Sequence, residues 1–237
     1  DDYNYKPSYI KISNLELRGT TSGNSYTTIN GSIATYGVAA AVYLQASRYV
    51  TIENCIITDN GNGVFTMAKD ELLSQAAEFV TLRNNRIFGN GVSGSYYEHN
   101  VYMQCNQPLV EGNYFGQVRT GSLGSTYKTR SSRDIIRFNY FEGSARILDL
   151  VNSEDQDVDG IVKQAEYGTD FIYGNILVND SSLPLGGTYA GVHYGGDNLG
   201  EDEASATTGV ADKYRKQLYF FNNVYYVKAT SGFRICL

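Results

Sequence analysis

One apolar frame recurs seven times along the chain and constrains the fold more than any other feature. In each copy an apolar residue precedes a middle residue by three positions, and a second apolar residue follows the middle one by two positions. The copies are Ile12/Leu15/Leu17, Ile52/Cys55/Ile57, Leu82/Asn85/Ile87, Val110/Asn113/Phe115, Ile136/Asn139/Phe141, Ile172/Asn175/Leu177 and Phe220/Asn223/Tyr225. Successive middle residues lie 40, 30, 28, 26, 36 and 48 positions apart. Such a period is typical of solenoids, whose coils stack on one another.

The middle residue of the frame is Asn in five of the seven copies. An Asn that recurs once per coil can stack inside a turn and hydrogen-bond to neighbouring backbone groups. The composition agrees, because 21 Tyr and 25 Gly without Trp suit strands and tight turns. We therefore predict an all-β fold, a right-handed parallel β-helix of about seven coils that forms a single domain over residues 1–237.

Two segments interrupt the repeat. Ala68–Glu78 carries apolar residues at helical spacing, which predicts a short inserted helix near 69–78. Asp197–Tyr214 is rich in Gly, Asp, Glu, Ala and Thr and is expected to be a solvated excursion. Solenoids usually end in polar caps, whereas the last residues here are apolar. The chain can therefore be a fragment that lacks a cap at one or both ends. Further coils of a larger chain, or end-to-end self-association, would then cover those ends.

A second short strand follows most copies of the frame, in GVFTM, NVYMQC, TYKTR, ILDL, GVHY and GFRI. Side chains alternate between the two faces of a strand, so every second residue points outward when the apolar members point inward. The outward set then comprises Tyr102, Gln104, Lys128, Arg130, Asp149 and His193. Neighbouring coils lie about 4.8 Å apart. We therefore expect a polar stripe along one face of the solenoid.

The segment Asp155–Glu166, DQDVDGIVKQAE, matches the EF-hand calcium loop. Aspartates stand at positions 1, 3 and 5, Gly at 6, an aliphatic residue at 8 and Glu at 12. The predicted Ca²⁺ ligands are Asp155, Asp157, Asp159, the backbone carbonyl of Ile161, and Glu166. The flanking sequence indicates strands and not helices, which favours a structural clasp over a switching sensor. The alternative is an acidic surface loop that binds nothing.

Charge and composition exclude several classes of protein. A formal net charge of −6 argues against a nucleic-acid partner, and the sequence has no apolar run long enough for a membrane span. A local cationic groove or a bound divalent cation can still hold an acidic polysaccharide. The three cysteines fit no disulfide or zinc pattern and are expected in the core. The chain begins without a leader, as expected of a mature form, a fragment or a cytoplasmic protein.

The polar stripe contains the groups needed for β-elimination in a uronate polysaccharide. This reaction requires a cation for the uronate carboxylate, a base for the C5 proton and an acid for the leaving oxygen. Lys128 is the candidate base and Arg130 a candidate carboxylate clamp. His99 and His193 can act as acid or base, and Asp149 can orient either one or a sugar hydroxyl. The candidate substrate-binding residues are Tyr97, Tyr102, Gln104 and Arg133.

Each of these assignments has a structural alternative. Outward Lys, Arg and Asp side chains on neighbouring coils can form a ladder of ion pairs. His99 and Tyr97 can close a loop through local hydrogen bonds. His193 lies between Gly191 and Gly195 and can flank a turn. Hydrolysis is less favoured than elimination, because it needs two carboxylates and only Glu98 is near enough in the predicted coils to pair with Asp149.

Five segments, in order, resemble the bacterial secreted right-handed parallel β-helix repeat proteins of the pectate-lyase-like superfamily. They are SYYEHNVYMQ, YKTRSSRDIIRFNYFEG, LDLVNSED, VHYGGDN and KYRKQLYFFNN, and the similarity extends from about Ile10 to Val227. The resemblance implies an extracellular location. A more distant similarity to lyases acting on alginate and dermatan sulfate implies that Lys128, in YKTRSS, is the base and that Arg146 assists it. The calcium-coordinating Asn and Glu of those lyases have no clear equivalents here.

Two functional hypotheses follow. The first is an extracellular carbohydrate-active β-helix that cleaves an acidic polysaccharide by β-elimination. The second is a non-catalytic, calcium-stabilised extracellular β-helix that binds glycans or forms a surface fibre or adhesin. The polar stripe favours the first hypothesis, and the apolar ends of the repeat favour the second.

Overall fold

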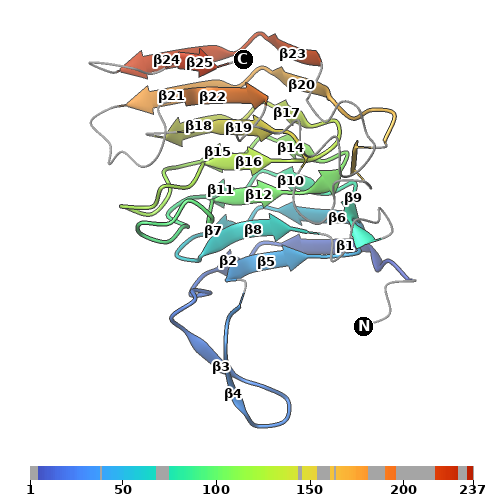
Figure 1. The fold of residues 1–237 in the computed structure, drawn as a ribbon, viewed down its shortest axis with the longest axis vertical. Helices are drawn as coiled ribbons and strands as arrows, with labels where there is room; N and C mark the ends of the chain where they lie inside the picture. Colours follow the sequence, from blue (N-terminus) through green and yellow to red (C-terminus); the bar gives the residue numbers. More distant parts are fainter. Residues whose placement is uncertain are drawn as a thin grey trace, which may run out of the picture.

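The computed structural model of the chain is a parallel β-helix, in which three sheets wind around one apolar core (Figure 1). The structure describes residues 5–37, 39–67, 75–143, 146–153, 161–162, 164–180, 190–195, 217–228 and 234–236. Among these residues the predicted all-β class and solenoid architecture are confirmed.

Sheet 1 contains β1 (Ser8–Ser13), β6 (Arg48–Glu53), β9 (Ala77–Glu78), β10 (Thr81–Arg83), β13 (Cys105–Asn106), β14 (Leu109–Glu111), β17 (Ile135–Arg137), β20 (Thr169–Tyr173) and β23 (Gln217–Phe221). Sheet 2 contains β2 (Glu16–Leu17), β7 (Ile56–Ile57), β11 (Arg86–Ile87), β15 (Tyr114–Phe115), β18 (Tyr140–Gly143), β21 (Ile176–Asp180) and β24 (Val224–Lys228). Sheet 3 contains β5 (Ala40–Leu44), β8 (Asn62–Thr66), β12 (Val101–Met103), β16 (Tyr127–Thr129), β19 (Leu148–Val151), β22 (Ala190–Gly195) and β25 (Arg234–Cys236).

Each coil passes through the three sheets in turn, and two passages through sheet 1 are split into two short strands, β9 with β10 and β13 with β14. The coil that begins at β10 passes through the turn at Asn85 into β11, then through a longer loop into β12. The described strands of neighbouring coils pair in parallel, and these pairings place equivalent positions of the sequence frame side by side. Leu82 is aligned with Ile52 below it and with Val110 above it. The predicted frame therefore corresponds to the stacking of coils.

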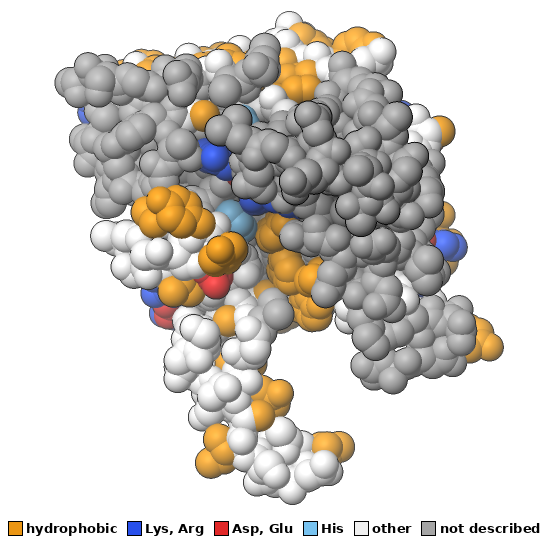
Figure 2. All heavy atoms as spheres, in the orientation of Figure 1, with side chains coloured by type: hydrophobic (Ala, Val, Ile, Leu, Met, Phe, Trp, Pro, Cys, Tyr) orange, Lys and Arg blue, Asp and Glu red, His pale blue; other side chains and the backbone are white. Residues whose placement is uncertain are grey.

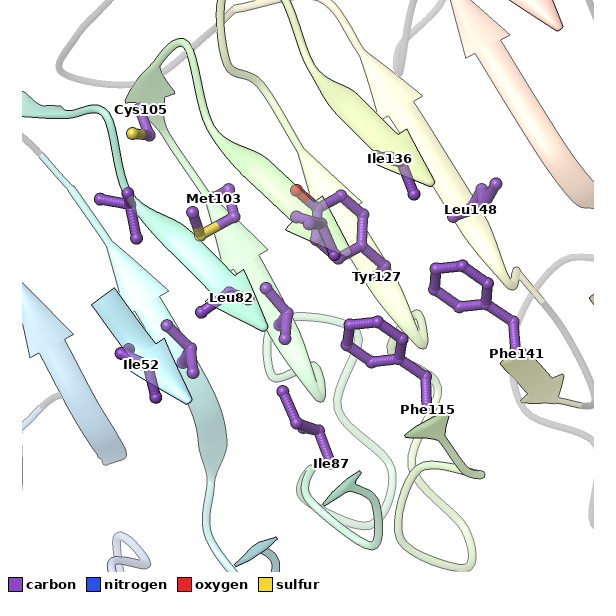
Figure 3. Packing of buried hydrophobic residues seen from close by; sticks show 14 of the residues in the cluster. Ile52, Leu82, Ile87, Met103, Cys105, Phe115, Tyr127, Ile136, Phe141 and Leu148 are labelled. Carbon is purple, nitrogen blue, oxygen red and sulfur yellow. The ribbon is translucent and has the colours of Figure 1, made fainter. Parts of the chain in front are cut away.

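The core is a column of side chains stacked in register (Figure 3). The first frame position fills it from sheet 1 and the last from sheet 2, and both are fully buried in the middle coils. Phe115 and Phe141, on adjacent strands of sheet 2, stack with their centroids 4.6 Å apart. Cys55 and Cys105 are buried free thiols, as expected. Burial of each large side chain contributes about 1.5–3 kcal/mol, so the column is the main stabilising element.

The middle Asn residues form a ladder in the turns between sheets 1 and 2. In each step the Asn Oδ1 accepts hydrogen bonds from the backbone N–H and the side-chain amide of the Asn one coil below. Each Asn amide also donates to the carbonyl of the inward residue at the start of the frame below. The ladder comprises Asn85, Asn113, Asn139, Asn175 and Asn223, and the backbone N–H of Cys55 ends it by donating to Asn85.

A second ladder of amides lies after sheet 2. Asn60 donates to Asn90, and Asn90 donates to Asn100, each through both the backbone and the side-chain amide at 2.9–3.1 Å. Asn100 then donates to the carbonyl of Gly116 at 2.8 Å. The sequence frame does not include this ladder, because loops of different length separate its members.

Two further expectations concern the interruptions of the repeat. The helix predicted near 69–78 lies mostly outside the described residues, and its last two residues form β9. The excursion over Asp197–Tyr214 also lies outside them. An antiparallel hairpin, β3 (Ser25–Thr27) with β4 (Ile33–Thr35), was not expected; it projects beyond the first coil in Figure 1.

Candidate functional site

A row of outward side chains on sheet 3 forms the candidate site. Tyr102 is aligned with Lys128, Lys128 with Asp149, and Asp149 with His193, on strands β12, β16, β19 and β22. We call these four residues the sheet 3 row. Their neighbours along each strand, such as Val101 and Met103, point into the core. The stripe predicted from the alternation of side chains is thus brought together by the stacking of coils.

Asp149 is the centre of the row. Its Oδ1 lies 2.8 Å from His193 Nδ1 and 3.1 Å from Arg146 Nη1. Its Oδ2 lies 3.0 Å from the same Arg146 nitrogen, accepts a 3.1 Å hydrogen bond from Ser125 Oγ, and is 3.9 Å from Lys128 Nζ. Burial opposes ionisation of Asp149, but the hydrogen bond from His193 and the charges of Lys128 and Arg146 outweigh it and hold the pKa of this carboxyl well below its usual range.

The contact with Asp149 fixes the hydrogen-bonding role of His193. A carboxylate only accepts hydrogen bonds, so Nδ1 of the imidazole carries the proton in the 2.8 Å contact. In the neutral ring the lone pair then lies on Nε2. A histidine oriented in this way by a buried carboxylate has the arrangement of a general base.

Arg130 and Lys128 both approach Tyr102. Arg130 Nε donates to the Tyr102 hydroxyl at 2.9 Å, and its Nη1 donates to the carbonyl of Asn152 at 2.7 Å. Lys128 Nζ lies 5.6 Å from the centroid of the Tyr102 ring, within cation–π range. Tyr102 thus contacts two cationic side chains, Arg130 through its hydroxyl and Lys128 through its ring.

His99 lies beside the sheet 3 row and is buried in a loop before β12. Its Nδ1 accepts a 2.8 Å hydrogen bond from the backbone N–H of Ser125, and its own backbone N–H donates to Asn62 Oδ1 at 2.9 Å. Because Nδ1 is an acceptor, the neutral ring carries its proton on Nε2, the opposite tautomer to His193. The ring packs edge-on against Tyr102, 5.2 Å between centroids. These contacts agree with the loop-closing interpretation of His99.

The remaining predicted residues occupy different places. Tyr97 is exposed in the loop before β12, and Gln104 is buried just after that strand. Arg133 does not join the row, because its backbone adopts a left-handed conformation (φ 50°) and its guanidinium lies 6.0 Å from Phe171 on the outer face of sheet 1. Arg146, inferred only from the resemblance, lies in the network around Asp149. Ser125 was not predicted; a serine in a Gly-rich loop has no distinguishing signal in the sequence.

The site is largely shielded from water. Lys128 is 9% exposed, Arg130 4% and Asp149 1%. Two partners of the carboxylate are more accessible, with 23% of the Arg146 side chain and 14% of the His193 side chain exposed. Basic and histidine side chains reach the surface along the middle of this face in Figure 2. The arrangement can hold an anionic group beside two cations and a histidine, and it can equally serve as a buried ion-pair network that stabilises the coils.

The predicted calcium loop cannot be traced in full. Asp155, Asp157 and Asp159 lie outside the described residues. Of the other two ligands, Glu166 is half-buried, and Ile161 packs its buried side chain against Tyr167. The carbonyl of Ile161 accepts a 3.1 Å hydrogen bond from the backbone N–H of Gln164. Within the described part of the chain, no three His, Cys, Asp or Glu side chains are grouped so as to hold a metal ion. Calcium binding therefore stays a prediction.

Comparisons with known proteins identify the architecture. A family model described as "Right handed beta helix region" matches residues 9–154, which is more than half of the chain. Neither the curated proteins nor the solved structures include a match. Among the described residues, no helix has the length and apolar character needed to cross a membrane.

Proposed function

We propose that this chain, which belongs to the family of right-handed β-helix proteins, acts outside the cell on an acidic polysaccharide and cleaves it by β-elimination at the sheet 3 row. The observation that carries the proposal is the contact of one buried carboxylate, Asp149, with His193 at 2.8 Å, Arg146 at 3.0 Å and Lys128 at 3.9 Å. These three partners provide a base and two cations, each within 3.9 Å of the same carboxylate.

In the proposed reaction Lys128 and Arg146 neutralise the carboxylate of a uronate residue. The charge neutralisation makes the C5 proton more acidic, because the negative charge that develops on the carboxylate is stabilised. His193 Nε2 takes the C5 proton, and the C5–H electrons form the C4–C5 double bond. The bond from C4 to the glycosidic oxygen breaks, and the leaving oxygen takes a proton from water. His193 afterwards releases its proton to solvent.

The base that we propose differs from the one that the resemblance to alginate and dermatan lyases implies. That resemblance implies Lys128 as base. Lys128 instead faces the carboxylate of Asp149, where its ammonium group completes an ion pair. A lysine used as a cation and a histidine used as the base agree better with these contacts, since the Nδ1 contact leaves Nε2 of the neutral ring as a proton acceptor.

Burial of the charged groups favours a second candidate function. Lys128, Arg130 and Asp149 are satisfied by one another and by neighbouring groups, as expected of a structural ladder of ion pairs. In that case the protein is a non-catalytic β-helix that binds glycans or builds an extracellular scaffold.

The distinguishing experiment follows the ultraviolet absorbance of unsaturated uronates during incubation with alginate, pectate and glycosaminoglycans. The lyase proposal predicts a rise on at least one substrate. It further predicts that His193→Ala lowers kcat by about 10²–10⁴-fold, the usual contribution of a general base. Lys128→Ala should also lower activity.

The matched control is Lys228→Ala, because Lys228 is an exposed lysine paired with Asp180 on sheet 2, away from the row. It should keep full activity. Absence of product on every substrate, or His193→Ala with wild-type activity, would reject the lyase proposal and leave the scaffold function.

A further inference from the structure

A hollow of about 420 Å³ lies on the outer face of sheet 2, away from the sheet 3 row. Gly116 is part of its lining. In the coils above, the outward position of Gly116 is occupied by Glu142, Val178 and Tyr226, whose strands pair in register. A Cβ atom on Gly116 would lie only 2.8 Å from Cβ of Phe88. The backbone of Gly116 therefore lies too close to Phe88 to carry a side chain without a shift.

Arg119 lines the hollow and is held in a fixed orientation. Its Nε donates to the carbonyl of Gly91 at 2.8 Å, and its Nη2 donates to Asp59 Oδ1 at 2.9 Å. The same Nη2 lies 3.4 Å from the carbonyl of Asn60. These partners come from two lower coils and tie down one side of the guanidinium, so little side-chain entropy remains to be lost when a ligand binds.

Arg86 also lines the hollow, and no carboxylate of the described residues pairs with it. Its guanidinium lies 5.4 Å from the centroid of the Tyr114 ring, within cation–π range. The opposite face of Tyr114 is stacked on Tyr140, 5.6 Å between centroids. The nearest candidate acid in the coil above, Glu142, accepts a hydrogen bond from the Tyr114 hydroxyl at 3.2 Å. Arg86 is therefore positioned by an aromatic ring and keeps its N–H donors for another acceptor.

The charge of the lining is opposite to that of the whole protein. The residues around the hollow include Arg86, Arg119, Gln117 and Thr120 and no Asp or Glu, whereas the chain as a whole carries a formal charge of −6. Guanidinium groups match the planar geometry of carboxylate and the oxygen faces of sulfate. We propose that this hollow binds an oxyanion, a carboxylate or sulfate group, with Arg86 and Arg119 as its ligands.

The oxyanion can belong to an acidic sugar or be free in solution, and the two sources share the same recognition chemistry. The site does not depend on the proposed lyase function, because it lies on another sheet and uses none of the residues of the sheet 3 row. If the substrate is an acidic polysaccharide, the hollow gives the protein a second contact with such chains.

The test follows the side-chain Nε–H signals of arginine by NMR at low ionic strength, where exposed charges are least screened. The probes are glucuronate, inorganic sulfate and, as a neutral sugar, glucose. We expect the signals of Arg86 and Arg119 to shift saturably with at least one of the two anions and not with glucose. Tighter binding of glucuronate identifies a sugar carboxylate as the source, and tighter binding of sulfate identifies a free oxyanion.

Variants of one coil provide the control. Arg86→Ala should weaken anion binding at least about tenfold, as expected for loss of a charge-assisted hydrogen bond. Arg83→Ala removes another arginine from the same coil, one that is half-buried and paired with Glu111 on sheet 1. It should leave binding unchanged. Equal affinities of Arg86→Ala and wild type, or anion shifts confined to other arginines, would overturn the proposal, whatever the outcome of the lyase assay.

Discussion

Replacing Asn139 by Ala tests whether the amide ladder holds the coils together. The side chain of Asn139 makes four ladder hydrogen bonds: it accepts two from Asn113 and donates one to Asn175 and one to the carbonyl of Val110. At about 1 kcal/mol each, their loss costs about 4 kcal/mol. The side chain is 2% exposed, so water cannot replace its oxygen without rearrangement of the turn.

Asn223 is the matched control at the other end of the ladder. It makes three comparable hydrogen bonds, but it is only half-buried, so water can satisfy the groups that Asn223→Ala leaves behind. We expect this variant to lose about 1 kcal/mol. The assay is urea unfolding followed by circular dichroism, together with hydrogen exchange of the Asn113 amide, which should lose protection in Asn139→Ala. Equal stability losses in the two variants, with the Asn113 amide still protected, would refute the reasoning.

Three further predictions concern charge, packing and metal. The pKa of Asp149 is lower in the folded than in the unfolded protein, so its ionised carboxylate stabilises the fold above about pH 4, and this contribution is lost as the pH falls further. In Asp149→Asn the free energy of unfolding should therefore fall less steeply with decreasing pH below about pH 4. Gly191→Ala would place a Cβ 1.9 Å from the Tyr225 hydroxyl and should lower the free energy of unfolding, measured with denaturant, by about 1–3 kcal/mol. The control Gly23→Ala, whose Cβ would have no atom within 4 Å, should lower it by less than about 0.5 kcal/mol. If the loop Asp155–Glu166 binds Ca²⁺, chelation should lower the Tm of the wild type but not of Asp157→Asn, and an unchanged wild-type Tm would remove calcium from the account.

The architecture could be predicted from sequence because its signal is repeated. Each copy of the frame is weak alone, but stacking requires the same residue type at the same place in every coil. The shared frame position therefore predicts which residues are neighbours on adjacent coils, such as Asn113 and Asn139, or Leu82 and Val110. The alternation along the second strand likewise placed Lys128 on the outer face of sheet 3.

The details of the site were less predictable, because they depend on turns and loops that do not repeat. A left-handed turn at Arg133 directs that side chain to sheet 1 although it is only five residues from Lys128. Asn90 and Asn100 belong to one ladder although they are ten residues apart, a spacing unlike that of the frame. The local sequence pattern also does not predict burial. The alternation of side chains places Asp149 on the outer face of the sheet but does not indicate that it is shielded from water.

The most direct test of the proposed site is the tautomeric state of its histidine. The chain has two histidines, so the imidazole nitrogens can be resolved by long-range ¹H–¹⁵N NMR at a pH where both rings are neutral. The contacts of His193 with Asp149 and of His99 with Ser125 predict opposite tautomers, protonated on Nδ1 in His193 and on Nε2 in His99. Asp149→Asn should change the His193 spectrum, and an acidic oligosaccharide should perturb its Nε2. A His193 ring protonated on Nε2, or one indifferent to both changes, would contradict the account.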